Sequence, residues 1–206
     1  MTIQFHDKQL SGDALDQIFN EARSYNGWLD QPVSDEQLSA IWDLLKMGPT
    51  SANMLPARIV WVKSDAAKAK LIECVADGNK AKVASAPVTA LIAMDIDFHE
   101  QLPWLFPHAD AKSWFEGDEE GRKEGAMRNS SLQGAYLMIA ARALGLDCGP
   151  MSGYDPDAVE EAFFSKAAGF GPKVKVNFIC SVGYGDKDSI FDRSPRPEFG
   201  KFNKIV

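Results

Sequence analysis

The chain has 206 residues, of which 45% are hydrophobic, and 22 Lys and Arg against 29 Asp and Glu give it a formal net charge of −7. A chain of this length buries roughly 70% of the surface that it would expose when unfolded, which favours one globular domain over residues 1–206. The acidic balance and the lack of a Lys/Arg run longer than a pair argue against a nucleic acid or an anionic membrane as the main partner.

The N-terminus, MTIQFHDKQL, has neither a basic segment nor an apolar one, and no apolar run approaches the ~20 residues that span a bilayer. We therefore expect a cytoplasmic protein. The three cysteines, Cys74, Cys148 and Cys180, are odd in number and far apart in sequence. This spacing favours reduced, buried cysteines over a disulfide or zinc framework.

Two helices are predicted near the N-terminus. The first covers residues 11–23 and breaks at Asn26-Gly27. The second begins at Ser34, which forms a capping-box pattern with Gln37, and ends at Gly48-Pro49. The apolar residues expected on their inner faces are Leu15, Ile18 and Phe19 in the first helix, and Leu38, Ile41, Trp42 and Leu45 in the second.

Three β-rich runs follow, at residues 58–63, 88–94 and 174–182, and each is bounded by proline, glycine or charge. A long helix is expected over residues 125–144, and Asp155-Pro156 is the N-cap and N1 pattern of another helix. We predict an α+β fold in which at least five helices surround a small mixed central sheet.

The long helix contains the run Ala135 to Ala140, which has no polar residue on any side. A helix that is apolar all round must be covered all round, either by its own domain or by another subunit. In so small a chain, a subunit interface is the better explanation, and we expect a homodimer.

Several familiar catalytic patterns are missing from the sequence. There is no P-loop and no Gly-x-Ser-x-Gly, and Gly183-Tyr-Gly185 lacks the third glycine of a dinucleotide loop. His6 lies near the terminus. Asp95, Asp97 and His99 alternate at strand spacing and could ligate a metal, but a solvated strand end is the better interpretation, so no metal site is predicted.

Chemistry is instead concentrated in four loops, at residues 22–28, 48–57, 149–155 and 192–197. They carry arginines, small hydroxyl residues, amides and rigid glycine-proline turns. These loops resemble those of the FMN-dependent nitroreductase family, and the resemblance implies FMN as their cofactor. FMN has a dianionic phosphate, a polar ribityl chain and a flat ring, which need such donors and an apolar slot.

In this order the loops resemble the FMN-dependent nitroreductase family over roughly residues 13–199. The resemblance implies a nitroreductase-like fold and a homodimer with flavin at the subunit interface. It also implies that the first and last loops hold the flavin phosphate, with Asn26 where a second cation is usual, and that the second loop contacts flavin from the partner subunit. The cofactor-binding residues so implied are Arg23, Ser24, Asn26, Pro49, Thr50, Ser51, Asn53, Pro150, Met151, Ser152, Gly153, Arg193 and Arg196.

Substrate choice is assigned to the aromatic segment Phe98 to Phe115, part of a lid-like insertion at about residues 95–125. Plain packing is an equally good account of its aromatic residues. Together with Gly48 to Asn53 and Arg128 to Ser131, this segment looks closest to the malonic semialdehyde reductase branch of the family, which belongs to the Rut pathway of pyrimidine degradation. We hypothesise that Arg128 clamps a substrate carboxylate and that His108 donates to, or orients, the carbonyl oxygen, although the two could exchange roles or merely support the fold.

The leading hypothesis is therefore an enzyme that passes hydride from NADH or NADPH through FMN to malonic semialdehyde, giving 3-hydroxypropionate. One alternative is a nitroarene, quinone or enone reductase of broad specificity. Another is a flavin-binding module without turnover, and a third is a flavin-free scaffold.

Overall fold

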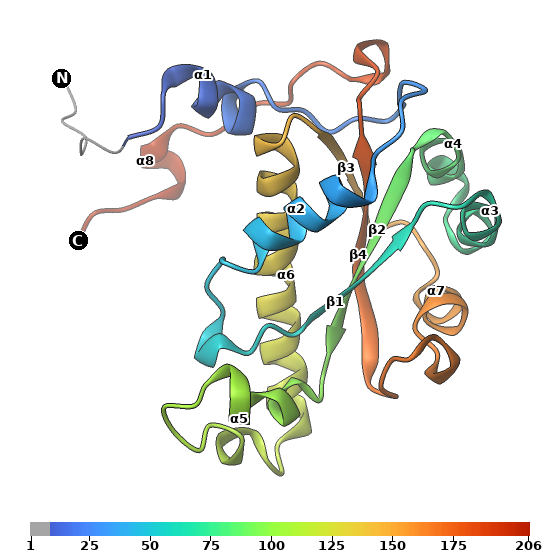
Figure 1. The fold of residues 1–206 in the computed structure, drawn as a ribbon. Coiled ribbons are helices and arrows are strands. Elements are labelled where there is room, and N and C mark those ends of the chain that lie inside the picture. Colours follow the sequence, from blue (N-terminus) through green and yellow to red (C-terminus); the bar gives the residue numbers. More distant parts are fainter. Residues whose placement is uncertain (1–8) are drawn as a thin grey trace.

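The computed structural model describes residues 9–206, so His6 lies outside the described part of the chain. Its centre is a sheet with the strand order β1-β2-β4-β3, which separates two layers of helices (Figure 1). The strands are β1 (Ala57–Val62), β2 (Val88–Asp95), β3 (Asp147–Met151) and β4 (Val174–Gly183). The predicted α+β class and three of these strands are confirmed.

Every neighbouring pair of these strands is antiparallel, so the sheet is not the mixed one that the sequence predicts. The only parallel element in the described chain is an isolated bridge between Ser24 and Cys148. Residues 149–155 are predicted to form a rigid turn that leads into a helix. In the structure Pro150 lies in β3, at an edge of the sheet, where proline is tolerated.

One helical layer consists of α2 (Asp35–Leu45) and α6 (Glu119–Ala143). The capping box at the start of α2 is confirmed, because the Ser34 hydroxyl accepts from the Gln37 N–H and the Gln37 side chain accepts from the Ser34 N–H. Ile41 and Leu137 are fully buried against this face of the sheet. Trp42, predicted to be buried, is 39% exposed.

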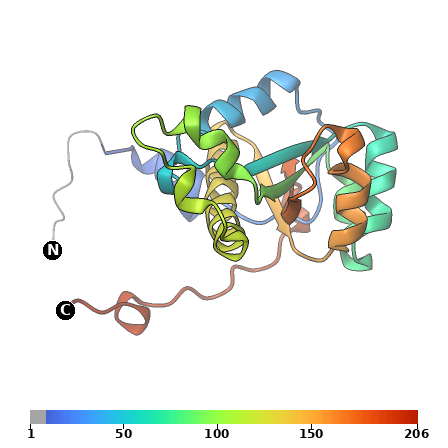
Figure 2. The same ribbon diagram turned by 90° about the horizontal axis from the view of Figure 1, so that it is seen from below.

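The opposite face of the sheet is covered by α3 (Asp65–Cys74), α4 (Asp77–Ser85) and α7 (Pro156–Phe163), as Figures 1 and 2 show. Leu71, Val83 and Val159 are the fully buried contributions of these three helices. Asp155 caps α7 by accepting from the Ala158 N–H, which confirms the predicted start of that helix.

The N-terminal helix differs from its prediction. The chain forms one α-turn, α1 (Gly12–Leu15), and continues as a π-turn, η1 (Asp16–Asn20). A π-turn advances the side chains by less than 100° per residue, so Phe19 leaves the face that Ile18 buries. Ile18 is buried as expected, whereas Phe19 is 53% exposed.

The segment between β2 and α6 is organised as short helical turns: η3 (Phe98–Gln101), α5 (Leu102–Leu105) and η4 (Ser113–Phe115). Phe98 and Leu102 are fully buried in a separate apolar cluster with Met54, whereas Trp104 is 70% exposed. Part of the segment is therefore core, as the packing interpretation predicts for its aromatics.

The long helix α6 begins six residues earlier than predicted, because Asp118 accepts from the Gly121 N–H and provides its cap. Leu137 and Ala140 face the core, whereas Tyr136 and Leu132 remain exposed. The predicted complete covering of this run is therefore not provided by the described chain itself. The expected subunit interface stays a prediction.

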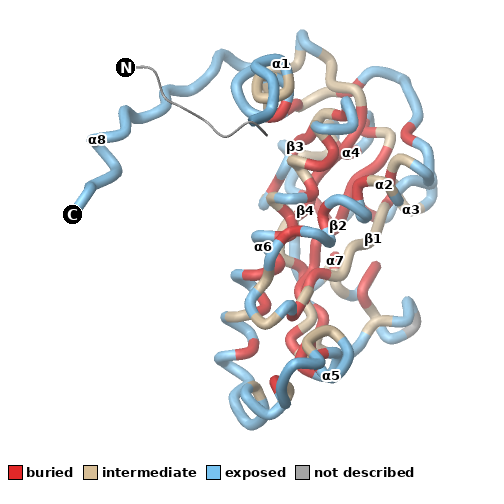
Figure 3. Tube along the Cα trace, turned by 60° about the vertical axis from the view of Figure 1, so that its left-hand side comes forward, coloured by how far each residue is buried: buried red, intermediate tan, exposed pale blue. Residues whose placement is uncertain are grey.

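The C-terminal segment runs from η6 (Lys187–Ser189) to α8 (Phe199–Phe202) and leaves the body of the molecule (Figures 1 and 2). From Phe191 onward it is exposed (Figure 3), and Phe199 and Phe202 are 64% and 71% exposed. All three cysteines are free and buried, as predicted. In residues 9–206 there is no helix long and apolar enough to cross a membrane.

Candidate functional site

Four arginines gather where η1, the end of α6 and the C-terminal segment meet. They line a pocket of about 310 Å³ whose remaining walls include Ser24, Phe19, Phe191 and Asp192. The arginines are Arg23, Arg142, Arg193 and Arg196. Three of them, and Ser24, are residues that the sequence assigns to a flavin phosphate.

These guanidinium groups are held by backbone carbonyls. Arg23 donates to the carbonyl of Phe191, Arg193 donates to Ala22 O at 3.1 Å, and Arg142 donates to Ile18 O at 3.2 Å. None of the four takes part in any ion pair of the described chain, although Asp192 lines the same pocket. Four cations without a bound carboxylate leave a net positive charge that an anionic ligand would neutralise.

Asn26 lies outside the lining of this pocket. Its Nδ2 donates to Ser189 O at 3.0 Å, and its backbone N–H donates to Ser189 Oγ at 3.3 Å. In the structure Asn26 thus connects the loop of residues 22–28 to η6. Its predicted contact with a cofactor stays a prediction.

Pro150, Met151 and Ser152 line a second hollow, of about 210 Å³, together with Phe178. The chain beyond β3 is fixed there, because Gly153 O accepts from both the Ala76 N–H and Asn79 Nδ2. Phe178 packs against Gly134 in the middle of α6, where a Cβ would lie 2.3 Å from its ring. This hollow therefore lies beside the middle of α6.

The loop that carries Pro49, Thr50, Ser51 and Asn53 lies near the first half of α6. Asn53 Nδ2 donates to Leu105 O at 2.8 Å, and the Ser51 N–H donates to Asn129 Oδ1 at 2.9 Å. Ala52, Asn53 and Leu55 have positive φ angles of 49°, 50° and 37°. Such strain persists only where the surroundings fix it, and it is a recurrent feature of ligand-binding loops.

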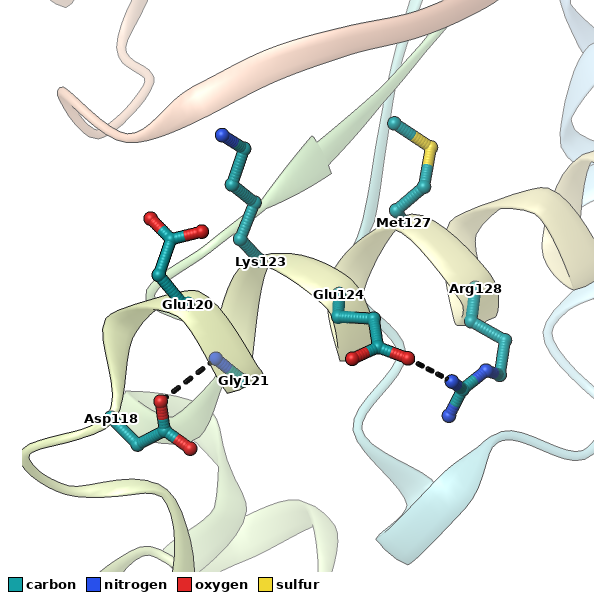
Figure 4. Close-up of a pocket in the computed structure, with 7 residues that line it drawn as sticks. All are labelled: Asp118, Glu120, Gly121, Lys123, Glu124, Met127 and Arg128. Carbon is teal, nitrogen blue, oxygen red and sulfur yellow. Dashed lines mark hydrogen bonds and ion pairs between the residues drawn. The ribbon is translucent and has the colours of Figure 1, made fainter.

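Arg128 and His108 belong to this same end of the molecule. Arg128 lies on α6 one residue before Asn129, and its guanidinium pairs with Glu124 one turn earlier (Figure 4). The side chain is 67% exposed and lines an open hollow of about 710 Å³ with Lys123 and Met127. His108 is exposed, and its ring lies edge-on to Phe106 with centroids 5.3 Å apart.

Apart from Asn26 and residues 150–153, the predicted site residues form two groups along α6, one at its last turn and one beside its first half. Arg142 and Arg128 are 14 positions apart, which corresponds to about 21 Å at 1.5 Å per residue. The end that holds Arg142, Arg23, Arg193 and Arg196 is called the arginine end below. The end that holds residues 50–53, His108 and Arg128 is called the loop end.

The sequence analysis missed Arg142 and its neighbour Asp147. Burial raises the pKa of Asp147 above its ordinary value, whereas the Gly185 N–H and the charge of Arg142 oppose that rise. Arg142 could have been noticed as a cation in the last turn of a helix, but that position is also ordinary for a charge that complements the helix dipole.

The strand-end residues Asp95 and His99 have structural partners. Asp95 pairs with Arg58 at 2.7 Å, and His99 is 7% exposed with Nε2 3.6 Å from Glu100 Oε1. Among residues 9–206, no three His, Cys, Asp or Glu side chains lie where they could hold a metal ion together.

The profile of the Nitroreductase family matches residues 19–184, which is most of the chain. The chain belongs to the nitroreductase family. Two relatives, each provisionally named NADH dehydrogenase/NAD(P)H nitroreductase, come from Polynucleobacter asymbioticus and Stenotrophomonas maltophilia. Each is 55% identical over 197 residues, covering 96% of this chain and 98% of the relative.

Solved structures of nitroreductases share the fold. A provisionally assigned nitroreductase from Exiguobacterium sibiricum, solved in complex with FMN, superposes with a TM-score of 0.81 at 22% identity and covers 96% of this chain and 99% of its own. An enone reductase of gut-bacterial fatty acid saturation, CLA-ER, gives a TM-score of 0.80 at 19% identity and covers 96% and 100%. The predicted nitroreductase-like fold is confirmed.

Proposed function

We propose that this nitroreductase family member is an FMN-dependent NAD(P)H oxidoreductase. The observation that carries the proposal is the arginine end, where four guanidinium groups line one pocket of about 310 Å³ without a carboxylate partner in the described chain. The FMN phosphate is a dianion that arginines bind with charge-assisted, often bidentate hydrogen bonds. Two further findings agree: an FMN complex of a structural neighbour and the NAD(P)H nitroreductase names of relatives.

The remaining parts of the chain fit the rest of such a cofactor. The apolar hollow beside Met151 and Phe178 suits a flat ring, and Ser24 offers a hydroxyl at the edge of the arginine pocket. When bound, FMN supplies the hydride transfer between NAD(P)H and an acceptor. The protein then has to bind, orient and exclude water, which requires no nucleophile or metal ligand.

We further propose that the site is completed in a homodimer. The two groups of site residues lie about 21 Å apart along α6, too far apart for one small pocket of a single chain. A two-fold axis would place the arginine end of one protomer beside the loop end of its partner. Exposed apolar side chains on and around α2 and α6 would then be covered, and these are Leu44, Met47, Leu132 and Tyr136.

For the acceptor, we propose a small 3-oxo acid, with malonic semialdehyde as the specific candidate. Such a substrate needs a cation for its carboxylate and a donor for its carbonyl oxygen. Arg128 and His108 are exposed at the loop end, within the same region that Asn53 ties to residues 98–115. Arg128 would have to exchange Glu124 for the substrate carboxylate.

One observation favours an uncharged acceptor instead. Because Arg128 already pairs with Glu124, the described loop end offers no free clamp for a carboxylate at that position (Figure 4). A nitroarene, quinone or enone would not need one. The second candidate function is therefore a reductase of such acceptors.

An anaerobic visible spectrum of the purified full-length protein tests both levels of this proposal. We expect a flavin spectrum that one equivalent of NADH or NADPH bleaches and that malonic semialdehyde restores. If only a quinone, an enone or a nitroarene restored the colour, the protein would still be an oxidoreductase, but its substrate would be an uncharged acceptor and not malonic semialdehyde. A bound flavin that neither nicotinamide bleaches would indicate a binding module, and a protein that takes up no FMN would contradict the proposal.

A further inference from the structure

We propose that Arg142 is a phosphate-binding residue that makes this chain select FMN over flavins without a phosphate. The inference rests on the proposed function and adds a residue that the sequence pattern of the loops does not include. It is carried by the position of Arg142, by the hydrogen bonds of its guanidinium and by the shape of η1.

Arg142 lies in the last turn of α6 and lines the same pocket as Arg23 and Arg193. Those two arginines lie outside helices and strands, Arg23 in the loop after η1 and Arg193 in the C-terminal segment. Arg142, by contrast, comes from a 25-residue helix whose neighbouring residues Ala140 and Ala141 are buried. It is therefore the arginine of this pocket with the most rigid attachment, which is the property that preorganises a binding site.

One side of the Arg142 guanidinium is already engaged and the other is not. Nη1 donates to Ile18 O at 3.2 Å, whereas Nε is buried and has no hydrogen-bond partner among the described residues. The Nε and Nη2 hydrogens form the side of a guanidinium that binds oxyanions with two parallel hydrogen bonds. A phosphate oxygen on this side would supply the acceptor that Nε lacks.

The π-turn η1 explains how the guanidinium is held. A π-turn uses i to i+5 hydrogen bonds, here from the Glu21 N–H to Asp16 O, and the Ile18 carbonyl accepts from Arg142. Gln17, in the same turn, donates from Nε2 to the carbonyl of Arg142 at 2.6 Å. Two contacts from one turn therefore fix Arg142 at both its backbone and its guanidinium, and π-turns of this kind are frequent at functional sites.

The test compares the affinities of the flavin-depleted full-length protein for FMN and for riboflavin, measured by quenching of flavin fluorescence. Riboflavin has the same ring and ribityl chain but no phosphate. We expect Arg142→Gln to weaken FMN binding about 10- to 100-fold, the usual range for one charge-assisted hydrogen-bonding group, and to leave riboflavin binding within about twofold. Arg142→Lys keeps the charge without the fork and should retain part of the preference.

Two control variants separate charge at the site from other effects. Lys46→Gln removes an exposed cation at the C-terminal end of α2, outside the lining of the arginine pocket, and should not change the ratio of the two affinities. Gln17→Ala removes the contact to the Arg142 carbonyl while keeping the guanidinium, and it should change the ratio by less than about threefold.

An equal loss of FMN and riboflavin affinity in Arg142→Gln would overturn the proposal, because it would mean that Arg142 only supports the fold around η1. An unchanged ratio would overturn it as well. If Arg142→Gln does not fold, Arg142→Lys takes its place. The proposal would be overturned if Arg142→Lys and the unmodified protein had the same ratio of FMN affinity to riboflavin affinity. If the unmodified protein bound FMN and riboflavin with equal affinity, the arginine pocket would not be a phosphate site. The observation on which the proposed function rests would then fail as well.

Discussion

The two ends of α6 handle charge in opposite ways. At its first turns, cations come with carboxylates: Arg128 pairs with Glu124, and Lys173 pairs with Glu119. At its last turn, Arg142, Arg23 and Arg193 gather in one pocket and donate to backbone carbonyls. A balanced surface is what solvation alone favours, whereas an unbalanced cluster in a protein of net charge −7 requires an anion to complete it.

The arginine end and the loop end differ in how they indicate function. The arginine end identifies its ligand by charge alone, because a dianion is the simplest partner for so many guanidinium groups. The loop end shows strain and exposure, which mark a binding loop without naming what binds. The cofactor class is therefore better determined by the structure than the acceptor is.

The largest effect is expected at the arginine end. Arg23→Ala combined with Arg193→Ala removes two charged donors, and we expect FMN affinity to fall about a thousandfold, with little change for riboflavin. Fluorescence titration of both flavins measures the effect. If FMN binding survived the double substitution, the phosphate would have to lie elsewhere.

The next prediction concerns the packed part of the loop end. Phe98→Ala removes a fully buried ring that contacts Phe115 at a centroid distance of 5.1 Å, and it should lower the free energy of unfolding by about 3–5 kcal/mol. Trp104→Ala, in the same segment but 70% exposed, should change it by less than about 0.5 kcal/mol. Urea unfolding of both variants measures the difference. Equal effects would mean that burial of Phe98 is not what stabilises this segment.

A third substitution distinguishes the two candidate acceptors. Arg128→Gln should raise KM for malonic semialdehyde about tenfold while FMN affinity and KM for a quinone stay unchanged, because only a carboxylate needs the clamp. Lys80→Gln, which removes an exposed cation on α4 at the opposite face of the sheet, is the matched control. An unchanged KM for malonic semialdehyde would remove the clamp role of Arg128 and favour the uncharged acceptors.

The smallest effect is expected at Asp147, whose pKa burial raises. The folded state binds a proton at this carboxyl more readily than the unfolded state, so its contribution to stability is largest at low pH and is lost as the pH rises through the folded pKa. Relative to Asp147→Asn, the unmodified protein should therefore gain stability as the pH falls from neutrality toward the ordinary carboxyl pKa of about 4. Urea midpoints at several pH values test the sign, and a relative loss on acidification would contradict it.

The sequence predicted the structure correctly where helix caps, turns and β-rich runs agree with the burial of the apolar residues. The capping box at Ser34, the Asp155-Pro156 start and the three β-rich runs formed as expected. Phe19 was misplaced because one π-turn shifts every following side chain, and no sequence period encodes such a turn. Strand β3 was missed because Pro150 fits an edge strand, and a sequence does not reveal which strand is at the edge.

The site shows the same division. Arg23 and Arg193 stood out because they lie in loops among small polar residues, and the structure brings them into one pocket. Arg142 lies within an apolar helix and joins that pocket only because α6 ends against η1, which is a tertiary contact. The two ends of α6 are likewise separated in one chain by the helix itself, and the sequence contains no measure of that distance.

The most direct test is a crystal structure of the full-length protein grown with FMN. The account predicts a two-fold dimer in which the FMN phosphate lies within hydrogen-bonding distance of Arg23, Arg142 and Arg193, with the ring beside Met151 and the partner's loop of residues 50–53. A phosphate bound away from these arginines, or flavin bound within a monomer, would contradict it.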